Sequence, residues 1–332
     1  MQNDISKFKI LKKELPKLKT NVSLKNYTTF RIGGVAKYFF VAKTKKDLLR
    51  AILAIKKYNL PFFILGGGSN LLVSDKGFNG LVIKMQNTKY KIQDTEIMAE
   101  AGVSLGKLVS ESLQIGAAGL EWAIGIPGTI GGAIRGNAGA FDESIADITK
   151  TVTVLEIPNP KSQILNSKFK TKILKNKDCK FDYRGSIFKY NPNLIIISAV
   201  LELKKGNKKE IKEKMKKYLD YRKKNHPLSF PSAGSVFKNK KLKIKNKKLL
   251  KEFPELKKFN QAELIPAGFL IEKCGLKGKR IGNVKISKKH TNFIVNLGQG
   301  QAEDVKKLIS LAKQKVKNKF RLKLEEEIQY LP

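Results

Sequence analysis

The sequence predicts an α+β protein that folds as three packed units. Strand-like and helix-like patterns alternate up to about residue 204, two glycine-rich segments stand near the ends of predicted strands, and the composition becomes strongly charged after Leu203. A chain of 332 residues is also too long for one small core. We therefore expect domains at residues 1–85, 86–204 and 205–332.

The first expected domain opens with Lys-rich residues 1–25, whose weak periodicity indicates an amphipathic helix. Thr44-Lys45-Lys46-Asp47 is typical of a capped helix start, and the apolar residues that follow recur on one helical face. Strands are predicted on both sides of this helix, at residues 37–41, 61–65 and 81–83. The order strand, helix, strand, strand indicates a small α/β unit.

The remaining elements follow from the same patterns. Residues 96–100, 151–155 and 194–201 are predicted as strands and residues 105–115 as a helix. Beyond residue 203, the pattern predicts helices at 204–224, 267–274 and 302–319 and strands at 292–296 and 322–328. Residues 225–231 are interpreted as a hinge or loop, and Lys-rich residues 239–251 as a mobile surface loop.

The formal charge of +39 is the strongest feature of the composition. It favours an anionic partner such as nucleic acid. However, only seven of the 67 basic residues are Arg, and the Lys residues are spread over nearly the whole chain. Base-reading surfaces rely on the planar fork of Arg, so we interpret the charge as a general Lys excess and predict no nucleic-acid partner.

The number of cysteines and the hydropathy of the chain predict the cellular compartment of the protein. Cys179 and Cys274 are too few and too isolated for a disulfide framework or a zinc site, so both are expected to be reduced thiols, and no metal is predicted. No window reaches the ~18 consecutive apolar residues of a membrane span, and the N-terminal residues lack a signal-peptide pattern. We therefore expect a cytoplasmic protein without a membrane partner.

Two glycine-rich segments predict a phosphate-binding site. They are Gly66-Gly67-Gly68-Ser69-Asn70 and Gly125-Ile126-Pro127-Gly128-Thr129-Ile130-Gly131-Gly132. Glycines at strand ends let the backbone approach a ligand closely, and successive N–H groups bind phosphate oxygens. Neither segment has the P-loop or Rossmann spacing, so a P-loop nucleotide hydrolase is disfavoured. A tight turn needs one or two glycines, and three in a row exceed that need.

Further motifs stand in order around these segments. They are Tyr27-Thr28-Thr29-Phe30-Arg31-Ile32-Gly33-Gly34, Asn137-Ala138-Gly139-Ala140, Tyr183-Arg184-Gly185-Ser186, Pro231-Ser232-Ala233-Gly234-Ser235-Val236-Phe237-Lys238-Asn239, Ala267-Gly268-Phe269-Leu270-Ile271-Glu272, Lys288-Lys289-His290-Thr291-Asn292 and Leu324-Glu325-Glu326-Glu327-Ile328. Together they resemble the UDP-N-acetylenolpyruvoylglucosamine reductase family, in a shorter subtype without a substrate-covering insertion. Two departures, Phe141-Asp142-Glu143 and Arg321, replace glycines of the family pattern and bear on local backbone shape.

The resemblance implies a fold, a reaction and a set of binding residues. The fold is the FAD-binding fold of the vanillyl-alcohol oxidase type, with two α/β subdomains, plus a C-terminal α/β substrate domain. NADPH reduces non-covalent FAD, which then reduces UDP-N-acetylglucosamine enolpyruvate to UDP-N-acetylmuramate for peptidoglycan synthesis. The implied cofactor-binding residues are Thr29, Arg31, Gly66, Gly67, Gly68, Ser69, Asn70, Leu71, Gly102, Pro127, Gly128, Thr129, Gly131, Gly132, Ala133 and Asn137.

The implied catalytic residues are Arg184, Ser235 and Glu327. Hydride addition leaves negative charge spread into the substrate carboxylate, which a guanidinium can stabilise. A protonated Glu327 would donate a second hydrogen bond, and Ser235 would deliver a proton to carbon. Glu327 is preferred to Glu325 from the family pattern alone, because both are expected on one strand face. Lys238, Asn239 and His290 are expected to bind substrate.

Alternatives remain open at this point. From the residues alone, Arg184 fits a surface position, Ser235 a turn, and Glu327 and His290 solvent-facing positions. A different flavoenzyme of the same fold, such as an oxidase, is the first rival. A nucleic-acid-binding module is the second. The leading hypothesis is a monomeric reductase acting on a small molecule.

Overall fold

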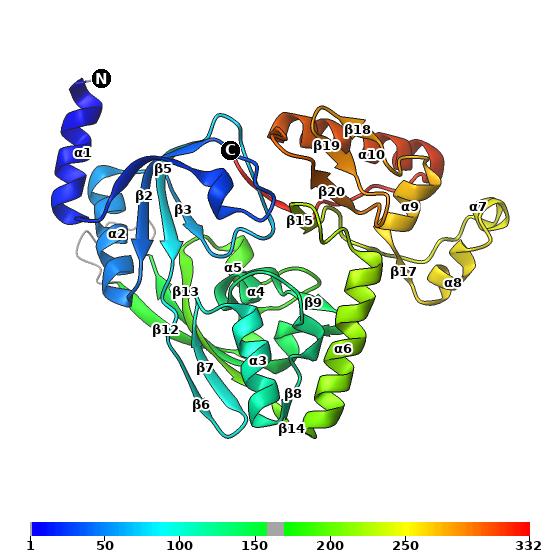
Figure 1. Cartoon of the computed structure of the whole chain (residues 1–332), viewed down its shortest axis with the longest axis horizontal. Helices are drawn as coiled ribbons and strands as arrows, with labels where there is room; N and C mark the ends of the chain where they lie inside the picture. Colours follow the sequence, from blue (N-terminus) through cyan, green and yellow to red (C-terminus); the bar gives the residue numbers. More distant parts are fainter. Residues whose placement is uncertain (1, 158–168) are drawn as a thin grey trace. The chain divides into compact units, whose positions relative to one another are not determined.

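The structure is a computed structural model that describes residues 2–157 and 169–332 (Figure 1). The chain separates into two compact units. Unit 1 consists of Met1–Val22, Ala36–Gly67 and Asn79–Arg222, and unit 2 consists of Ser23–Val35, Gly68–Phe78 and Lys223–Pro332. The domain boundaries expected after residues 85 and 204 stay a prediction.

The first sheet belongs mostly to unit 1 and has the strand order β1-β2-β5-β3. Its strands are β1 (Lys19–Ser23), β2 (Val35–Ala42), β5 (Phe78–Met85) and β3 (Phe62–Leu65). Helix α1 (Gln2–Glu14) precedes it, and the parallel pair β3 and β5 encloses the connection that carries the first glycine cluster. The helix expected over residues 1–25 therefore ends early, because residues 19–23 form a strand.

Helix α2 (Lys45–Tyr58) confirms the predicted helix start. The Thr44 hydroxyl accepts a hydrogen bond from the Asp47 amide at 3.1 Å, and the Thr44 amide donates to the Asp47 carboxylate at 3.0 Å. This capping box satisfies two amides that have no partner within the helix. Leu48, Ile52 and Ile55 are buried on one face, as the 3.6-residue period requires.

The second sheet of unit 1 is antiparallel, with the order β12-β11-β13-β7-β6. Its strands are β12 (Lys170–Lys175), β11 (Thr149–Glu156), β13 (Leu194–Glu202), β7 (Glu96–Glu100) and β6 (Tyr90–Gln93), which run side by side in Figure 1. The longer helices nearby are α3 (Leu105–Ile115) and α6 (Lys208–Asn225). The strands predicted at residues 96–100, 151–155 and 194–201 and the helix at 105–115 are thus confirmed.

Short elements connect these strands and helices. They are β8 (Ala117–Ala118), η2 (Glu121–Ala123), α4 (Ile130–Gly136), β9 (Gly139–Ala140), β10 (Glu143–Ser144), η3 (Ile145–Ile148), η4 (Asn176–Cys179), α5 (Ile187–Tyr190) and β14 (Lys204–Lys205). One apolar core runs through unit 1 and includes the fully buried Trp122 and Ile52.

Unit 2 is built on a four-stranded antiparallel sheet with the order β15-β20-β19-β18. The strands are β15 (Ser232–Ser235), β20 (Phe293–Asn296), β19 (Val284–Ile286) and β18 (Arg280–Ile281). Helices α9 (Ala267–Lys273) and α10 (Ala302–Phe320) belong to the same unit, and α10 lies along β18 and β19 (Figure 1). A second apolar core lies within this unit.

The remaining elements of unit 2 are short. They are η1 (Leu24–Tyr27), β4 (Leu71–Val73), β16 (Lys240–Lys241), α7 (Lys247–Glu252), α8 (Leu256–Gln261), β17 (Leu264–Ile265) and β21 (Gln329–Leu331). Strand β21 pairs in parallel with β4, with Gln329 opposite Leu71. This pairing joins the end of the chain to the strand that directly follows the first glycine cluster.

Three further predictions need correction. The terminal strand expected at residues 322–328 is wrong, because the strand is β21 and begins at Gln329. The helix expected from residue 204 begins at Lys208, because residues 204–205 pair with β8. The loop expected at residues 239–251 contains β16 and α7, because the Asn246 side chain caps α7 and Leu249 is buried.

Within residues 2–157 and 169–332, none of the helices combines the length with the apolar character that a membrane span requires.

Candidate functional site

The start of the first glycine-rich segment, Gly66 and Gly67, lies against the second segment within unit 1. A Cβ atom on Gly67 would lie 2.7 Å from the Gly128 Cα, and one on Gly66 would lie 2.7 Å from the Thr129 hydroxyl. Side chains at either position would therefore force the two segments apart. The sequence prediction that both segments serve one site agrees with this packing.

Helix α4 begins directly after the second segment. The Thr129 hydroxyl accepts a hydrogen bond from the Gly132 amide at 3.4 Å, and the Gly131 amide donates to the Ala101 carbonyl at 2.9 Å. A Cβ on Gly131 would approach the Ala101 Cβ to 2.9 Å. Gly102, also expected at the cofactor site, follows Ala101, so these predicted residues are neighbours in unit 1.

Unit 2 contains six of the sixteen predicted cofactor residues, namely Thr29, Arg31, Gly68, Ser69, Asn70 and Leu71. The Thr29 amide donates to the Gly68 carbonyl at 3.2 Å, and the Thr29 hydroxyl donates to the Ser232 carbonyl at 2.7 Å. The Asn70 side-chain amide donates to the Glu327 carbonyl at 3.1 Å. The segments around Thr29 and Asn70 thus lie beside residues expected to act on substrate.

Ser235 and Glu327 are brought close by backbone pairing within unit 2. Ser235 ends β15 opposite Phe293, and the Glu327 amide donates to the carbonyl of the next residue, Val236, at 2.8 Å. The Lys238 amide donates to the Glu325 carbonyl at 2.8 Å. The segment with the three glutamates therefore runs beside the segment that starts at Ser235.

The structure distinguishes the three consecutive glutamates. Glu325 is exposed and forms an ion pair with Lys240, which lowers the pKa of its carboxyl group. Glu326 pairs with Lys313 and accepts a hydrogen bond from the Tyr330 hydroxyl. Glu327 is half-buried. The expected shared strand face of Glu325 and Glu327 is wrong, because residues 325–327 form only an isolated bridge.

Arg184 belongs to unit 1 and lies in a tight turn that runs from Asp182 to Gly185. Its φ of 61° is left-handed, its guanidinium donates to the Gly139 carbonyl at 2.6 Å, and it lies 5.1 Å from the ring centre of Tyr183. Arg184 is thus tied to the motif that follows α4. Its joint action with Ser235 and Glu327 stays a prediction.

Two of the residues expected to bind substrate, Asn239 and His290, have defined side-chain contacts in unit 2. The Asn239 side-chain oxygen accepts from the Ala267 amide at 3.2 Å, at the start of α9. His290 is half-buried, and this burial lowers the pKa of its imidazole. Its ring lies 5.4 Å from the ring of His226 and 4.9 Å from that of Phe293. His290 is thus packed among rings, which corrects the alternative of a solvent-facing position.

At both places where the chain departs from the glycine pattern of the family, the backbone is left-handed. Phe141 and Asp142 have φ of 55° and 62°, and Arg321 has φ of 57° at the end of α10. Such angles cost a non-glycine residue roughly 1–2 kcal/mol. The Phe141 ring stacks on Tyr218 at 3.9 Å, which offsets part of that cost.

Sequence reasoning missed two cations in unit 1, the half-buried Lys84 and the buried Arg222. The Lys84 ammonium group donates to the Gly66 carbonyl, and burial lowers its pKa. Arg222 is buried and donates to the Trp122 carbonyl at 2.9 Å, while its Nε has no hydrogen-bond partner among the described residues. A signal for Lys84 existed, because it interrupts the apolar run Leu81–Met85. Arg222 carried no signal in a Lys-rich helix.

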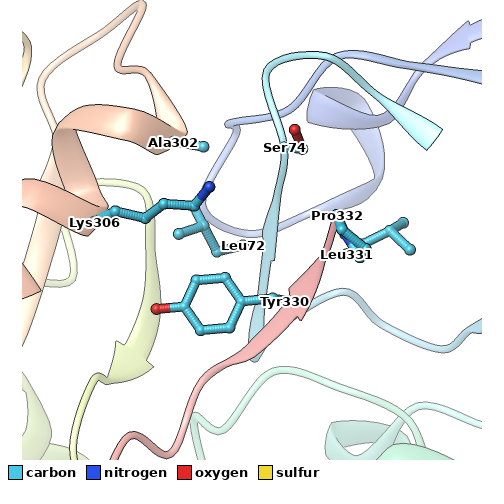
Figure 2. A pocket seen from close by; sticks show the side chains of 7 residues that line it. All are labelled: Leu72, Ser74, Ala302, Lys306, Tyr330, Leu331 and Pro332. Carbon is cyan, nitrogen blue, oxygen red and sulfur yellow. The ribbon is translucent and has the colours of Figure 1, made fainter.

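A pocket of about 240 Å³ lies elsewhere in unit 2, at β4 and β21 (Figure 2). Figure 2 shows the Tyr330 side chain and the Lys306 side chain beside Leu72. The lining residues are Leu72, Ser74, Ala302, Lys306, Tyr330, Leu331 and Pro332. None of them was predicted as a site residue, so this pocket is not the predicted site.

Comparison with known proteins identifies related sequences and folds. A family described as FAD binding domain matches residues 36–167, and one described as UDP-N-acetylenolpyruvoylglucosamine reductase, C-terminal domain, matches residues 226–331. The chain is 39% identical to the UDP-N-acetylenolpyruvoylglucosamine reductase of Caldanaerobacter subterraneus subsp. tengcongensis, over 98% of this chain and 96% of that protein.

Two further comparisons agree with these matches. The reductase of the same name from Caldicellulosiruptor bescii is 38% identical, over 93% of this chain and 88% of that protein. The crystal structure of the enzyme from Thermus caldophilus superposes with a TM-score of 0.73 at 32% identity, covering 95% of this chain and 98% of that chain.

Proposed function

Because the chain belongs to the UDP-N-acetylenolpyruvoylglucosamine reductase family, we propose that it reduces UDP-N-acetylglucosamine enolpyruvate to UDP-N-acetylmuramate. The chain is an FAD-dependent oxidoreductase of α+β fold, with NADPH as electron donor, which confirms the predicted fold class and cofactors. The observation that carries the proposal is the close packing of Gly66 and Gly67 against Gly128 and Thr129 within unit 1.

The residues present fit the chemistry of FAD. Gly66, Gly67 and Gly131 leave no room for side chains in the observed packing. Such segments expose backbone N–H groups to the diphosphate. When bound, FAD accepts hydride from NADPH and passes hydride to the substrate double bond. The implied residues from Thr29 to Ala133 are proposed to hold it, with Gly66–Leu71 and Pro127–Ala133 contributing most contacts, whereas the side chain of Asn137 is proposed to hold the Arg184 turn.

The chain's own residues are proposed to manage charge and protons. The guanidinium of Arg184 would pair with the substrate carboxylate, where negative charge develops. Glu327 would donate a hydrogen bond to the same group, and the Ser235 hydroxyl would supply a proton to carbon. Support for Ser235 and Glu327 comes from their adjacent backbone segments in unit 2. Lys238, Asn239 and His290 are proposed to bind the UDP-sugar.

The proposal includes a monomer in the cytoplasm, without nucleic-acid or membrane partners. The dispersal of Lys over the chain and the scarcity of Arg support the absence of a nucleic-acid partner. A small-molecule UDP-sugar substrate is consistent with the family.

The direct test follows flavin absorbance without oxygen. NADPH should bleach the bound flavin, and UDP-N-acetylglucosamine enolpyruvate should then restore the absorbance with formation of UDP-N-acetylmuramate. A reduced flavin that the enol ether leaves unchanged would contradict the proposal. In a separate assay in air, flavin reduction by an alcohol followed by reoxidation by oxygen would favour the oxidase alternative. A colourless protein with tight, salt-sensitive DNA binding would favour the nucleic-acid module.

A further inference from the structure

We propose that Asn137 is a positioning residue for Arg184, and that its side-chain amide serves the Arg184 turn rather than the cofactor. The inference rests on the proposed function, because Arg184 is the expected carboxylate-binding group of that reaction. It changes the role that the sequence predicts for Asn137, which was cofactor binding.

The Asn137 side chain is buried and both ends of its amide are engaged within unit 1. Its Nδ2 donates to the Asp182 carbonyl at 2.7 Å, and its Oδ1 accepts from the Ala146 amide at 3.2 Å. One partner is an acceptor and the other a donor, so this orientation of the amide is the one that satisfies both. Nδ2 keeps a second N–H and Oδ1 a second lone pair, so any further contact would have to meet the amide in this fixed orientation.

The bond to Asp182 holds the first residue of the turn that presents Arg184. Within this turn, the Asp182 amide donates to the Gly185 carbonyl at 3.1 Å, and the Gly185 amide donates to the Asp182 carbonyl at 3.2 Å. Arg184 itself has the unfavourable left-handed φ of 61°. Backbone strain of this kind persists where the surroundings over-determine the conformation.

The turn is also fixed on its other side. The Ser186 hydroxyl donates to the Arg135 carbonyl at 2.8 Å, and the Arg184 guanidinium donates to the Gly139 carbonyl. The residues that hold the turn, Arg135, Asn137 and Gly139, therefore come from the end of α4 and the strand after it. Figure 1 shows α5, which begins just after the turn, beside α4.

Helix α4 links this turn to the cofactor segment. Thr129 caps the start of α4 at the second glycine-rich segment, and Asn137 ends the helix with a left-handed φ of 42°. Asn tolerates that conformation better than most residues. One short rigid helix thus sets the distance between the glycine segment and Arg184. Hydride transfer depends on such distances, because a misplacement of about 1 Å can cost on the order of 100-fold in rate.

The experiment measures the two half-reactions separately in the FAD-loaded enzyme. Asn137→Asp keeps the shape of the side chain but turns the donor toward Asp182 into an acceptor. We expect flavin reoxidation by UDP-N-acetylglucosamine enolpyruvate to slow about 10–100-fold, as is typical for residues that orient a functional group. Flavin reduction by NADPH and the FAD content should stay within about twofold of wild type.

Asn176→Asp is the matched control. The Asn176 amide also donates to backbone carbonyls, those of Ala146 at 2.8 Å and Thr149 at 2.7 Å, but has no bond to the Arg184 turn. Both half-reactions should stay near wild type in this variant. Asn137→Gly is a second test, because Gly keeps the left-handed backbone while removing the amide, and it should slow the same half-reaction.

A double variant shows whether the effect passes through Arg184. Adding Asn137→Asp to Arg184→Ala should cause little further loss, because the positioned group is already absent. Unchanged reoxidation in both Asn137 variants would overturn the inference. So would loss of FAD, or an equal loss in both half-reactions, because these indicate cofactor binding or a general structural role. If the wild type itself fails to reoxidise, the proposed function falls and this inference with it.

Discussion

At the residue scale, Ser235 is the most sharply testable site residue. Its backbone is fixed by pairing with β20, and its role as proton donor concerns only the second half-reaction. We expect Ser235→Ala to slow flavin reoxidation by the enol ether by about 10²–10⁴-fold, while NADPH reduces the flavin at a near-normal rate. Stopped-flow absorbance measures both steps.

Ser232→Ala is the matched control for this prediction. Ser232 lies on the same strand, and its hydroxyl accepts a hydrogen bond from the Gly234 amide at 3.4 Å. Both half-reactions should survive this change. Equal losses in Ser235→Ala and Ser232→Ala would point to the strand rather than to a proton donor.

Cys179 provides a residue-scale prediction about pH. Its thiol is fully buried, and burial raises its pKa from 9.0 to about 11. Below pH 9 the thiol is protonated in both the folded and the unfolded chain, so it adds no pH dependence. Between pH 9 and 11 the unfolded chain loses the proton first, so the free energy of unfolding falls as pH rises.

Urea unfolding from pH 8 to pH 10.5 checks this prediction. Subtracting the curve of Cys179→Ala isolates the thiol from Lys and Tyr residues that titrate in the same range. The stability difference between wild type and variant should shrink toward high pH. A difference that stays constant would contradict a buried, protonated thiol.

At the element scale, the contact between the glycine-rich segments is predicted to be intolerant of a methyl group. Gly67→Ala would place a Cβ against the Gly128 backbone, so we expect a loss of about 1–3 kcal/mol in stability and weaker FAD binding. Gly136→Ala is the control, because no atom lies within 4 Å of its added Cβ in α4. Alanine should stabilise that helix by about 0.5–1 kcal/mol. Thermal unfolding and flavin titration test both variants.

The end of α10 allows a second prediction at this scale. Arg321 ends the helix in the left-handed conformation, where glycine is favoured. We expect Arg321→Gly to raise the free energy of unfolding by up to about 1 kcal/mol. Lys317→Gly, in the exposed part of the same helix, should lower it by about 1 kcal/mol. If Arg321→Gly instead lowers the free energy of unfolding, the contacts of the Arg321 side chain stabilise the protein by more than its left-handed backbone destabilises it.

At the scale of the whole molecule, the charge of +39 predicts a dependence of stability on salt. Most ion pairs in the described residues involve exposed side chains, such as Lys216 with Asp220, and contribute little. Excess positive charge repels itself in the compact state, and salt screens that repulsion over about 8 Å at physiological strength. We expect the melting temperature of the FAD-saturated protein to rise between low salt and about 0.15 M NaCl. A flat or falling curve would indicate that the Lys excess is locally balanced.

The sequence by itself determined the features that depend on short-range patterns. Helix α2 begins where Thr44 and Asp47 predict it, and α3 and α10 begin where the 3.6-residue period predicts them. The glycine-rich segments and the motif order also sufficed to indicate the family and its cofactor. Capping and periodicity involve residues within one or two helical turns, so a linear pattern contains the needed information.

Only the tertiary structure decided features that depend on partners distant in sequence. The last strand begins at Gln329 because it pairs with β4, whose residues lie near position 72. Glu325 is exposed and pairs with Lys240, whereas Glu326 is half-buried and pairs with Lys313, a residue of α10. Lys84 donates to the Gly66 carbonyl, and Asn137 holds the Arg184 turn, and in both cases the partner is not specified by neighbouring residues in the sequence. Long-range pairing sets burial and side-chain partners, and these cannot be inferred from neighbours in the chain.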